Sequence, residues 1–258
     1  MKPIDSTEEK GNWLNIEQID SSIRILTVYI PSFISDFLLA GRAEHAKKTH
    51  KPGFLDPDAY HDLLSESESE TLNTFKTVKR QVQWLAGRFA VKILAGHLFP
   101  PSYKPSEIEI VCTDSGAPYL PAFPEICISI SHSNEYAAGL VNYAPGMTAG
   151  IDIEKHPLTN AETVIRNAFS EAECRALKGA PSQEMTRHWT IKEAFLKYMK
   201  KGLHEDPRNI EVSGDTIVFR GTVLDRVYIR TINIDENYIL STVLTADSTP
   251  IPRSAVGL

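Results

Sequence analysis

Two short acidic segments could together hold a divalent cation beside a phosphate group. In Gly150-Ile151-Asp152-Ile153-Glu154 the carboxylates of Asp152 and Glu154 are two residues apart, so on a strand both point to the same face. Neighbouring acids repel each other, and a divalent cation removes that conflict. Hard oxygen ligands of this kind suit Mg²⁺. The alternative is a pair of acids on a solvated strand face, and the D-x-E spacing alone does not exclude it.

A second segment, Trp189 to Lys197, has a helical pattern that places Glu193 and Lys197 on one face. Taken alone, this pair is typical of a surface salt bridge. Beside a metal-binding D-x-E pair it would supply a third acid and a phosphate-binding lysine, as phosphoryl transfer requires. Upstream, Ser131-His132-Ser133 ends an apolar strand. His132 could bind a phosphate, act as a base or simply end that strand.

The helices that must position these residues are indicated by apolar spacing. Apolar residues three or four apart from Leu72 to Ile93 predict an amphipathic helix. A capping box formed by Ser65 and Glu68 marks its start or that of a short helix before it. Another capping box at Ser170 begins a short helix, and a further helix is predicted over residues 183–200. Candidate core residues of that last helix are Trp189, Phe195, Leu196 and Met199.

The strands are indicated by alternation of apolar and polar residues between turn signals. Three strands surround the chemistry-bearing residues, at 127–131, 135–143 and 148–154. A further strand is predicted from Ile23 to Ile30, and the segment 40–62 is predicted to be a loop with at most one short helix. The stretch 209–246 alternates again, with Gly214-Asp215 as a hairpin turn.

An internal repeat relates the two helical stretches. When Ser65 is placed on Ser170 without gaps, both capping boxes, two tryptophans and two lysines coincide. The matched pairs include Glu68 with Glu173, Leu72 with Leu177, Trp84 with Trp189 and Lys92 with Lys197. A repeat of this length predicts two similar α+β halves split near residue 143, with a ligand-binding cleft between them. We expect an extension at 1–20, an N-terminal half at 21–143, a C-terminal half at 144–246 carrying the acids, and a frayed tail at 247–258.

Composition excludes several classes of protein. The 258 residues allow one large domain or two small ones, and 42% hydrophobic residues are typical of a globular chain. No apolar run approaches the roughly 20 residues of a membrane helix, and we expect no signal peptide. A net charge of −6 argues against nucleic-acid binding as the main task. Cys112, Cys127 and Cys174 are predicted to be buried thiols in a reducing compartment, which favours the cytoplasm.

The order of the motifs resembles the 4′-phosphopantetheinyl transferases of the large, two-half type, called the surfactin type. The motifs are SISHS (129–133), GIDIE (150–154), FSEAE (169–173) and W-x-x-KEAFLK (189–197), with further likeness at 65–88 and 114–121. The resemblance covers residues 63–205. It implies a pseudo-twofold α+β fold, in which each half is a small sheet packed on a long helix and the active site lies in the cleft between the halves.

The resemblance also implies an enzyme that uses coenzyme A and Mg²⁺. Carried over by position, it makes Asp152, Glu154 and Glu193 the metal ligands. Glu193 or a metal-bound water is the implied base, and Lys197 the implied contact to the phosphates. Coenzyme A would be bound by residues from both halves, with His132 at its 3′-phosphate. These implied coenzyme A ligands are Arg80, Arg88, Ser131, His132 and Lys197.

The implied reaction moves the phosphopantetheine arm to a serine of an acyl or peptidyl carrier protein and releases 3′,5′-ADP. We expect a monomer that acts without nucleic acid or membrane. Because such carriers are acidic, a lysine group at 192, 197, 200 and 201 is expected near the cleft, with Lys200 and Lys201 steering the carrier. The alternative is that these two are solvated helix-end lysines.

One departure from the family's pattern concerns the nucleotide end. The family has Gly-Lys-Pro where this chain has Gly116-Ala117-Pro118, so the turn is kept but its lysine is missing. Arg42, Lys47 or Lys48 in the upstream loop are candidate replacements.

Three rival hypotheses come from other functional classes. A Mg²⁺-dependent nuclease or phosphatase would need a second metal set, and only three acids lie in the motifs. A non-catalytic carrier-binding module would have lost one of these acids, and a purely structural protein leaves the order of motifs unexplained.

Overall fold

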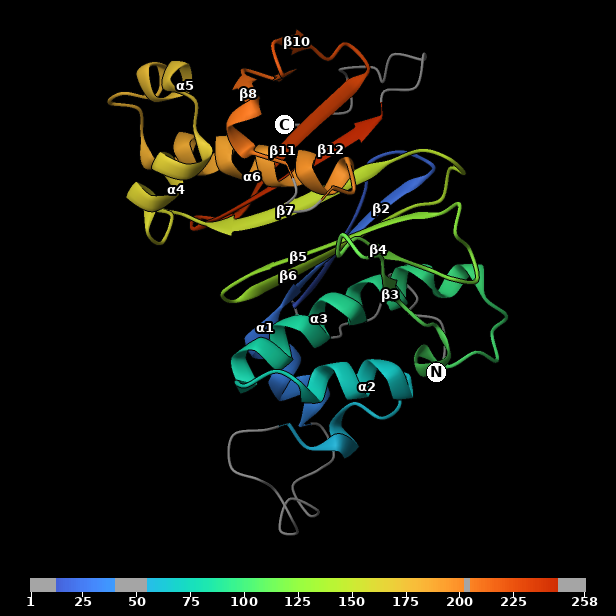
Figure 1. Ribbon diagram of the computed structural model, residues 1–258. Helices are drawn as coiled ribbons and strands as arrows, with labels where there is room; N and C mark the ends of the chain where they lie inside the picture. The colour runs from blue at the N-terminus through green and yellow to red at the C-terminus, as the bar shows by residue number, and fades with distance from the viewer. Residues whose placement is uncertain (1–12, 40–54, 202–204, 246–258) are drawn as a thin grey trace.

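The computed structural model describes residues 13–39, 55–201 and 205–245. Two antiparallel sheets lie face to face between two long helices, so the layers run helix, sheet, sheet, helix (Figure 1). The predicted α+β class is confirmed, whereas the pseudo-twofold relation between the halves stays a prediction. Within the described ranges, none of the helices is long and apolar enough to cross a membrane.

The N-terminal sheet has four strands in the order β1-β2-β6-β5, and α3 (Val78–Ala95) packs on it. Its strands are β1 (Leu14–Gln18), β2 (Ile23–Tyr29), β5 (Cys127–Ser133) and β6 (Tyr136–Asn142). Around it lie α1 (Ile30–Ser32), a π-helical turn (Phe33–Leu38), α2 (Glu66–Asn73) and a two-stranded ribbon of β3 (Val111–Cys112) and β4 (Pro118–Tyr119). Short 3₁₀ turns occupy Pro57–Ala59, Gly96–Leu98 and Pro105–Glu107.

The C-terminal sheet has three strands in the order β11-β12-β7, and α6 (Ser182–Tyr198) packs on it. The strands are β7 (Ala149–Lys155), β11 (Val227–Asp235) and β12 (Tyr238–Thr245). Two short helices, α4 (Ala161–Ala168) and α5 (Glu171–Ala176), precede α6. A 3₁₀ turn (Pro207–Asn209) leads to a small sheet of β8 (Ile210–Ser213), β9 (Thr216–Phe219) and β10 (Thr222–Val223), with the predicted hairpin at Gly214-Asp215.

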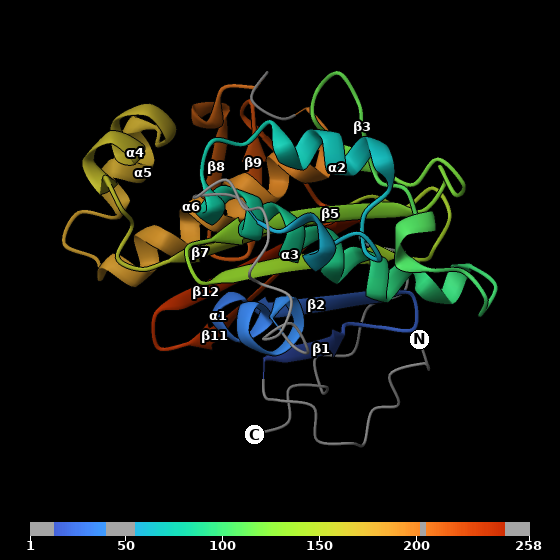
Figure 2. The same ribbon diagram turned by 90° about the horizontal axis from the view of Figure 1, so that it is seen from below.

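An apolar core joins the two sheets. Ile151 and Ile153 of β7 are fully buried there, against Ile25 of β2 and Leu140 of β6. Because strand side chains alternate, Asp152 between these isoleucines and Glu154 after them point away from this core, toward α6. At the far edge of the molecule, Arg230 Nη2 of β11 lies 3.3 Å from Glu17 Oε2 of β1 (Figure 2). The halves are therefore held at both edges and through their centre.

The predicted helix from Leu72 to Ile93 is wrong in one respect, because it is two helices. Leu72 is buried near the end of α2, and Thr77 begins α3 with its hydroxyl accepting the N–H of Arg80 at 3.3 Å. The Ser65–Glu68 capping box belongs to the shorter helix α2. Val82, Leu85 and Phe89 of α3 face the core as the spacing predicts.

Two other predictions are corrected by the structure. The part of the 1–20 extension that the structure describes is not loose, because Leu14–Gln18 pairs with β2 along its full length. Only Cys127 is buried, whereas Cys112 and Cys174 are exposed. The tail 247–258 and most of the loop 40–62 lie outside the described residues.

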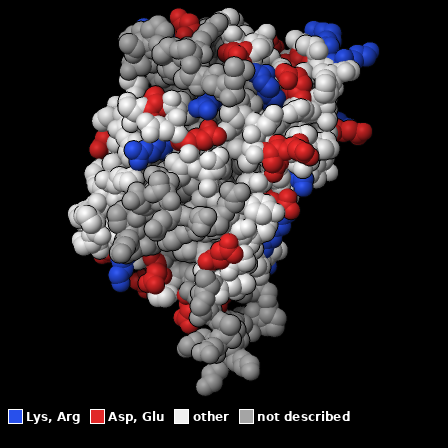
Figure 3. All heavy atoms as spheres, turned by 180° about the vertical axis from the view of Figure 1, so that it is seen from behind, with Lys and Arg blue, Asp and Glu red and all other residues white. Residues whose placement is uncertain are grey.

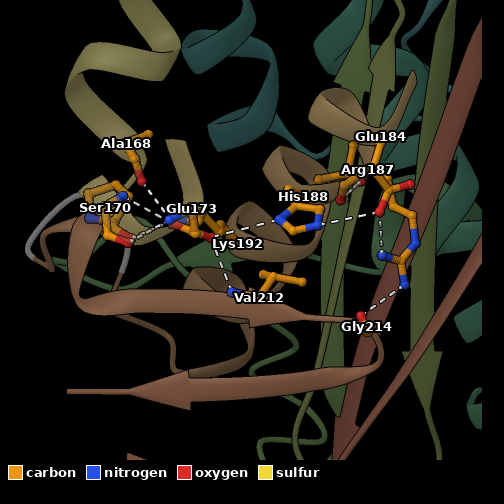
Figure 4. A network of polar contacts seen from close by, with 11 residues as sticks. Ala168, Ser170, Glu173, Glu184, Arg187, His188, Lys192, Val212 and Gly214 are labelled. Atoms are coloured by element: carbon orange, nitrogen blue, oxygen red, sulfur yellow. Dashed lines mark hydrogen bonds and ion pairs between the residues drawn. The ribbon is translucent and has the colours of Figure 1, made fainter. Parts of the chain in front are cut away.

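A buried glutamate–lysine pair occurs in each half and ties a capping box to a long helix. Lys92 Nζ lies 2.5 Å from Glu68 Oε2 and donates to Leu63 O at 2.8 Å. Lys192 Nζ lies 2.5 Å from Glu173 Oε2 and donates to Ala168 O at 2.7 Å (Figure 4). The lysine follows the glutamate by 24 residues in the first pair and by 19 in the second.

The contacts therefore match Lys92 with Lys192, not with Lys197 as the gapless repeat predicts. Lys192 is completely buried, so its predicted place in the cleft lysine group is wrong. Its ammonium also donates to Pro207 O, and Glu173 Oε1 accepts the Val212 N–H at 3.1 Å. This network fixes α4, α5 and the small sheet to α6.

Candidate active site

The candidate site lies where the edge strands of the two sheets meet. β5 and β7 run side by side and in parallel, joined by side chains of β5 that bond to the backbone of β7. The N–H groups of Ile151 and Ile153 donate to Ser129 Oγ at 3.1 Å and Ser131 Oγ at 3.3 Å. This seam brings the Ser131-His132-Ser133 end of one sheet against the D-x-E strand of the other.

Gly150 sets how closely α6 approaches β7. A Cβ atom at this position would lie 2.0 Å from Ala194 O and 2.4 Å from Tyr198 N, both backbone atoms of α6. Real Cβ atoms do not approach backbone so closely, so only glycine permits this packing. The face of β7 that carries Asp152 and Glu154 is thereby placed directly under the turn of α6 that carries Glu193 and Lys197.

Asp152 lies at the centre of the group and is 4% exposed. Its Oδ1 accepts hydrogen bonds from Lys197 Nζ at 2.7 Å and from Ser131 Oγ at 2.6 Å. Its Oδ2 is buried and has no hydrogen-bond partner in the described part of the chain. A buried carboxylate oxygen without a partner is costly unless something else binds it.

Burial and the charge of Asp152 disfavour the ionised forms of the other two acids. Burial, followed by the charge of Asp152, raises the pKa of Glu154 and that of Glu193 to about 7. Ser133 Oγ donates to Glu154 Oε2 at 2.7 Å, which partly offsets the rise. Asp152 is therefore close enough to Glu154 and to Glu193 for its charge to disfavour theirs.

His132 points to the other side of β5, toward α3. Its Nε2 is in hydrogen-bond contact with Nη1 of Arg80, whose guanidinium also lies 5.3 Å from the Phe75 ring centre. Burial, the charge of Arg80 and the charge of Lys197 lower the pKa of His132 to about 4. The imidazole is neutral near pH 7, and two cations lie close enough to affect it.

Arg88 is the one predicted ligand that the structure does not bring to this group. It is 7% exposed, its guanidinium lies 3.4 Å from the Trp84 ring centre, and its Nε is 3.3 Å from Glu68 Oε1. These contacts hold it in the N-terminal half beside the Glu68–Lys92 pair, which argues against its predicted role at the nucleotide.

The loop around Ala117 contacts the end of α6. Ser115 Oγ donates to Lys200 O at 2.9 Å, and Lys200 has a positive φ of 54°. The next residue, Lys201, is exposed. The candidate replacements for the missing lysine, Arg42, Lys47 and Lys48, lie outside the described residues.

A pocket of about 380 Å³ opens beside the acids, lined by His132 and Ser133 of β5, Glu154 of β7, and the apolar Leu158 and Trp189. A second pocket of similar volume, between the start of α6 and β11, is lined by none of the predicted site residues and lies outside this chemistry.

The residues of the site suit a hard divalent cation in charge and donor type. One buried oxygen of Asp152 has no partner, and the charge of Asp152 contributes to the raised pKa values of Glu154 and Glu193. Across the described ranges, however, the structure contains no set of three His, Cys, Asp or Glu side chains already gathered in ligating geometry. The carboxylate oxygens that could bind a metal are present, but Asp152 Oδ1 accepts a hydrogen bond from Lys197 Nζ instead.

Sequence reasoning missed two groups at this site. Ser133, which donates to Glu154, is not among the predicted ligands, and neither is the Ser115 contact that joins the Ala117 loop to α6. The alternation of small polar residues Cys127, Ser129, Ser131 and Ser133 on one face of a strand is the signal that could have indicated the first.

Comparison with known proteins gives consistent matches. Residues 148–243 match the family model described as the 4′-phosphopantetheinyl transferase superfamily. A 4′-phosphopantetheinyl transferase of Bacillus subtilis is 29% identical over 194 residues, 72% of this chain and 84% of that protein. The 4′-phosphopantetheinyl transferase HetI of Nostoc sp. is 30% identical over 149 residues, 54% of this chain and 61% of that protein. A holo-[acyl-carrier-protein] synthase of Petrotoga mobilis is 37% identical over 87 residues, 29% of this chain and 73% of that protein.

Proposed function

The chain belongs to the 4′-phosphopantetheinyl transferase superfamily, and from this membership we propose that it transfers the 4′-phosphopantetheine arm of coenzyme A to a serine of an acyl or peptidyl carrier protein. The proposed metal is Mg²⁺ and the proposed leaving product is 3′,5′-ADP. The observation that carries the proposal is the position of Asp152 at the seam of the two sheets, bonded to Lys197 and close enough to Glu154 and Glu193 to raise their pKa values.

The reaction asks the protein for charge neutralisation and alignment more than for covalent chemistry. The serine oxygen of the carrier forms a bond to the β-phosphorus of coenzyme A. The bond from that phosphorus to the bridging oxygen breaks, and 3′,5′-ADP leaves with the electron pair. The nucleophile belongs to the partner, which is consistent with the absence of a nucleophile motif in the sequence.

Glu193 is the candidate base for the serine proton. Without metal, burial and the charge of Asp152 raise the pKa of Glu193 to about 7. Bound Mg²⁺ would lower that pKa, so a metal-bound water is the alternative base where Glu193 ligates the metal. Lys197 lies on the same helix face and carries the positive charge nearest to Asp152. It would hold the phosphates and stabilise the leaving group.

Asp152, Glu154 and Glu193 would hold Mg²⁺, which supplies Lewis-acid stabilisation of the pyrophosphate when bound. His132 and Arg80 lie on the α3 side of β5, in the other half, and would bind the 3′-phosphate end of the nucleotide. Because His132 is neutral and its Nε2 accepts from the Arg80 guanidinium, its Nδ1 N–H is the donor that it offers, without the desolvation cost of a buried charge.

The test is a mass measurement on an apo carrier protein incubated with the chain, coenzyme A and Mg²⁺. We expect the carrier to gain the mass of one phosphopantetheinyl group, and chelation of Mg²⁺ to stop the gain. Asp152→Asn preserves the shape of a buried side chain but removes its charge, so it should abolish transfer. Glu162→Gln, an exposed carboxamide substitution on α4, is the control and should retain full activity.

Normal transfer by Asp152→Asn would contradict the metal assignment. Absence of any mass gain with acyl, peptidyl and fatty-acid carriers would contradict the proposed activity itself.

A further inference from the structure

The seam between the two sheets is a ladder of four small side chains on one face of β5. Cys127, Ser129, Ser131 and Ser133 each accept the backbone N–H of a β7 residue. The accepted N–H groups are those of Ala149 at 3.3 Å, Ile151 at 3.1 Å, Ile153 at 3.3 Å and Lys155 at 3.3 Å. The ladder replaces the backbone pairing that two edge strands would otherwise make.

The last two rungs of the ladder do more than join the strands. Ser131 accepts the N–H of Ile153 and donates its hydroxyl to Asp152 Oδ1 at 2.6 Å. Ser133 accepts the N–H of Lys155 and donates to Glu154 Oε2 at 2.7 Å. Each serine thus accepts one backbone N–H of β7 and donates to the carboxylate of the β7 residue that precedes that N–H group in the sequence.

The Ser129 rung has the same backbone contact without a carboxylate. Its N–H partner is Ile151, and the residue before Ile151 is Gly150, which has no side chain. Substituting Ser129 therefore measures only what this hydrogen bond contributes to joining the sheets. Substituting Ser131 or Ser133 measures that contribution together with the effect on the neighbouring carboxylate.

We propose that Ser131 and Ser133 are positioning residues, which fix the carboxylates of Asp152 and Glu154 in the orientation that binds the metal. This inference rests on the proposed function, and it assigns Ser131 a role at the acids in addition to the predicted one at coenzyme A. Both serines are nearly fully buried, so water cannot replace a lost hydroxyl without rearrangement. A carboxylate released from its serine has rotamers that point away from the third acid, Glu193.

The effect of removing such a partner is large. Substituting outer partners of metal ligands lowers metal affinity by about 10- to 100-fold. The loss arises because ligand orientation must then be fixed at the moment of binding. Removing a hydroxyl that only joins the strands lowers the stability of the fold instead, and leaves the Mg²⁺ affinity of the folded protein unchanged.

The experiment measures Mg²⁺ binding to the full chain by calorimetry, in the absence of coenzyme A, together with thermal unfolding. Ser131→Ala and Ser133→Ala should each weaken Mg²⁺ binding about tenfold or more. Ser129→Ala should lower the melting temperature by a comparable amount but bind Mg²⁺ within twofold of the unchanged protein. The same ranking is expected for the Mg²⁺ concentration that half-saturates transfer.

If Ser133→Ala does not fold, Ser133→Cys takes its place, because Cys127 already forms a rung of this ladder through Sγ. Its thiol is a weaker donor to Glu154, so Mg²⁺ affinity should still fall severalfold. Equal Mg²⁺ affinity in all variants, or an equal loss in Ser129→Ala, overturns the positioning role while leaving the proposed function intact. Failure of the unchanged protein to bind Mg²⁺ overturns both the metal assignment and the positioning role.

Discussion

At the scale of single residues, His132 combines burial with two neighbouring cations. Its lowered pKa means that the folded protein disfavours the imidazolium, whereas the unfolded chain does not. Between pH 6.5 and about 4 the unfolded chain therefore binds more protons than the folded protein. The stability that the neutral imidazole contributes is present above pH 6.5 and is lost as the pH falls toward 4.

We expect the ring resonances of His132 to titrate with a midpoint well below 6 in an NMR experiment. A bound 3′,5′-ADP should raise that midpoint, because a phosphate favours the imidazolium and offsets the charges of Arg80 and Lys197. Replacing His132 with Asn should reduce the loss of stability between pH 6.5 and 4, measured by urea unfolding. A midpoint near 6.5 in the free protein, or one that 3′,5′-ADP leaves unchanged, would contradict this role.

The sequence predicted which side chains lie together where both belong to one strand or one helix. Asp152 and Glu154 share a face because a strand has a period of two, and Glu193 and Lys197 share a face because a helix turns every 3.6 residues. The Ser133–Glu154 contact was not predictable in the same way, because it joins strands whose relative register no local pattern specifies. The contact of Arg88 with Glu68 was not predictable either, because Glu68 lies on a different helix.

At the scale of elements, the packing of α6 on β7 depends on the absence of one side chain. Gly150→Ala would place a methyl group against the backbone of Ala194 and Tyr198, and neither can move without the whole helix. We expect a loss of about 1–3 kcal/mol in the free energy of unfolding. Transfer should fall by much more than the unfolded fraction explains, because Glu193 and Lys197 move away from Asp152 with the helix.

The matched control is Gly96→Ala, which lies just after α3 with a helical φ of −52° and nothing within 4 Å of the added Cβ. That change should leave stability equal or slightly higher, because alanine restricts the unfolded chain. Chemical denaturation and transfer rate, measured on the same samples, check both variants. Full transfer activity in Gly150→Ala would show that the spacing of helix and strand is not critical.

Two helix starts followed from the sequence because each carries a complete capping box. The boxes at Ser65 and Ser170 are both present as hydrogen-bonded caps. Helix α4 was not predicted, because its N-cap, Asn160, has a positive φ and makes no side-chain cap, so its start carries no such signature. The gapless repeat pairs Lys92 with the wrong lysine. The lysine that bonds the capping-box glutamate lies 24 residues after it in the first half but only 19 residues after it in the second.

At the scale of the whole molecule, the chain is acidic while the carriers it is proposed to meet are acidic as well. On the face seen in Figure 3, acidic and basic side chains are interspersed without a large patch of one sign. Attraction must then be local, and Lys201 is the exposed base just beyond α6. Lys200 is a poorer candidate for substitution, since it is only partly exposed and has a positive φ of 54°.

We expect Lys201→Glu to raise the KM for the carrier at least threefold and to flatten its salt dependence, with kcat and the affinity for coenzyme A unchanged. Charges at the rim of an interface act mainly on association. Lys178→Glu makes the same change in net charge at an exposed residue between α5 and α6. Equal effects of the two substitutions on carrier KM would show that Lys201 has no specific part in recognition.

The single crossing of the chain between the halves, the loop from residue 143 to 148, has a practical consequence. Arg80, Ser131 and His132 precede it, and the three acids and Lys197 follow it, so neither side of the loop holds a complete site. A break after Pro145 would leave two fragments, each exposing the apolar face that the other covers. Such fragments should be inactive when expressed alone and regain transfer when expressed together, so that activity becomes a reporter of their encounter.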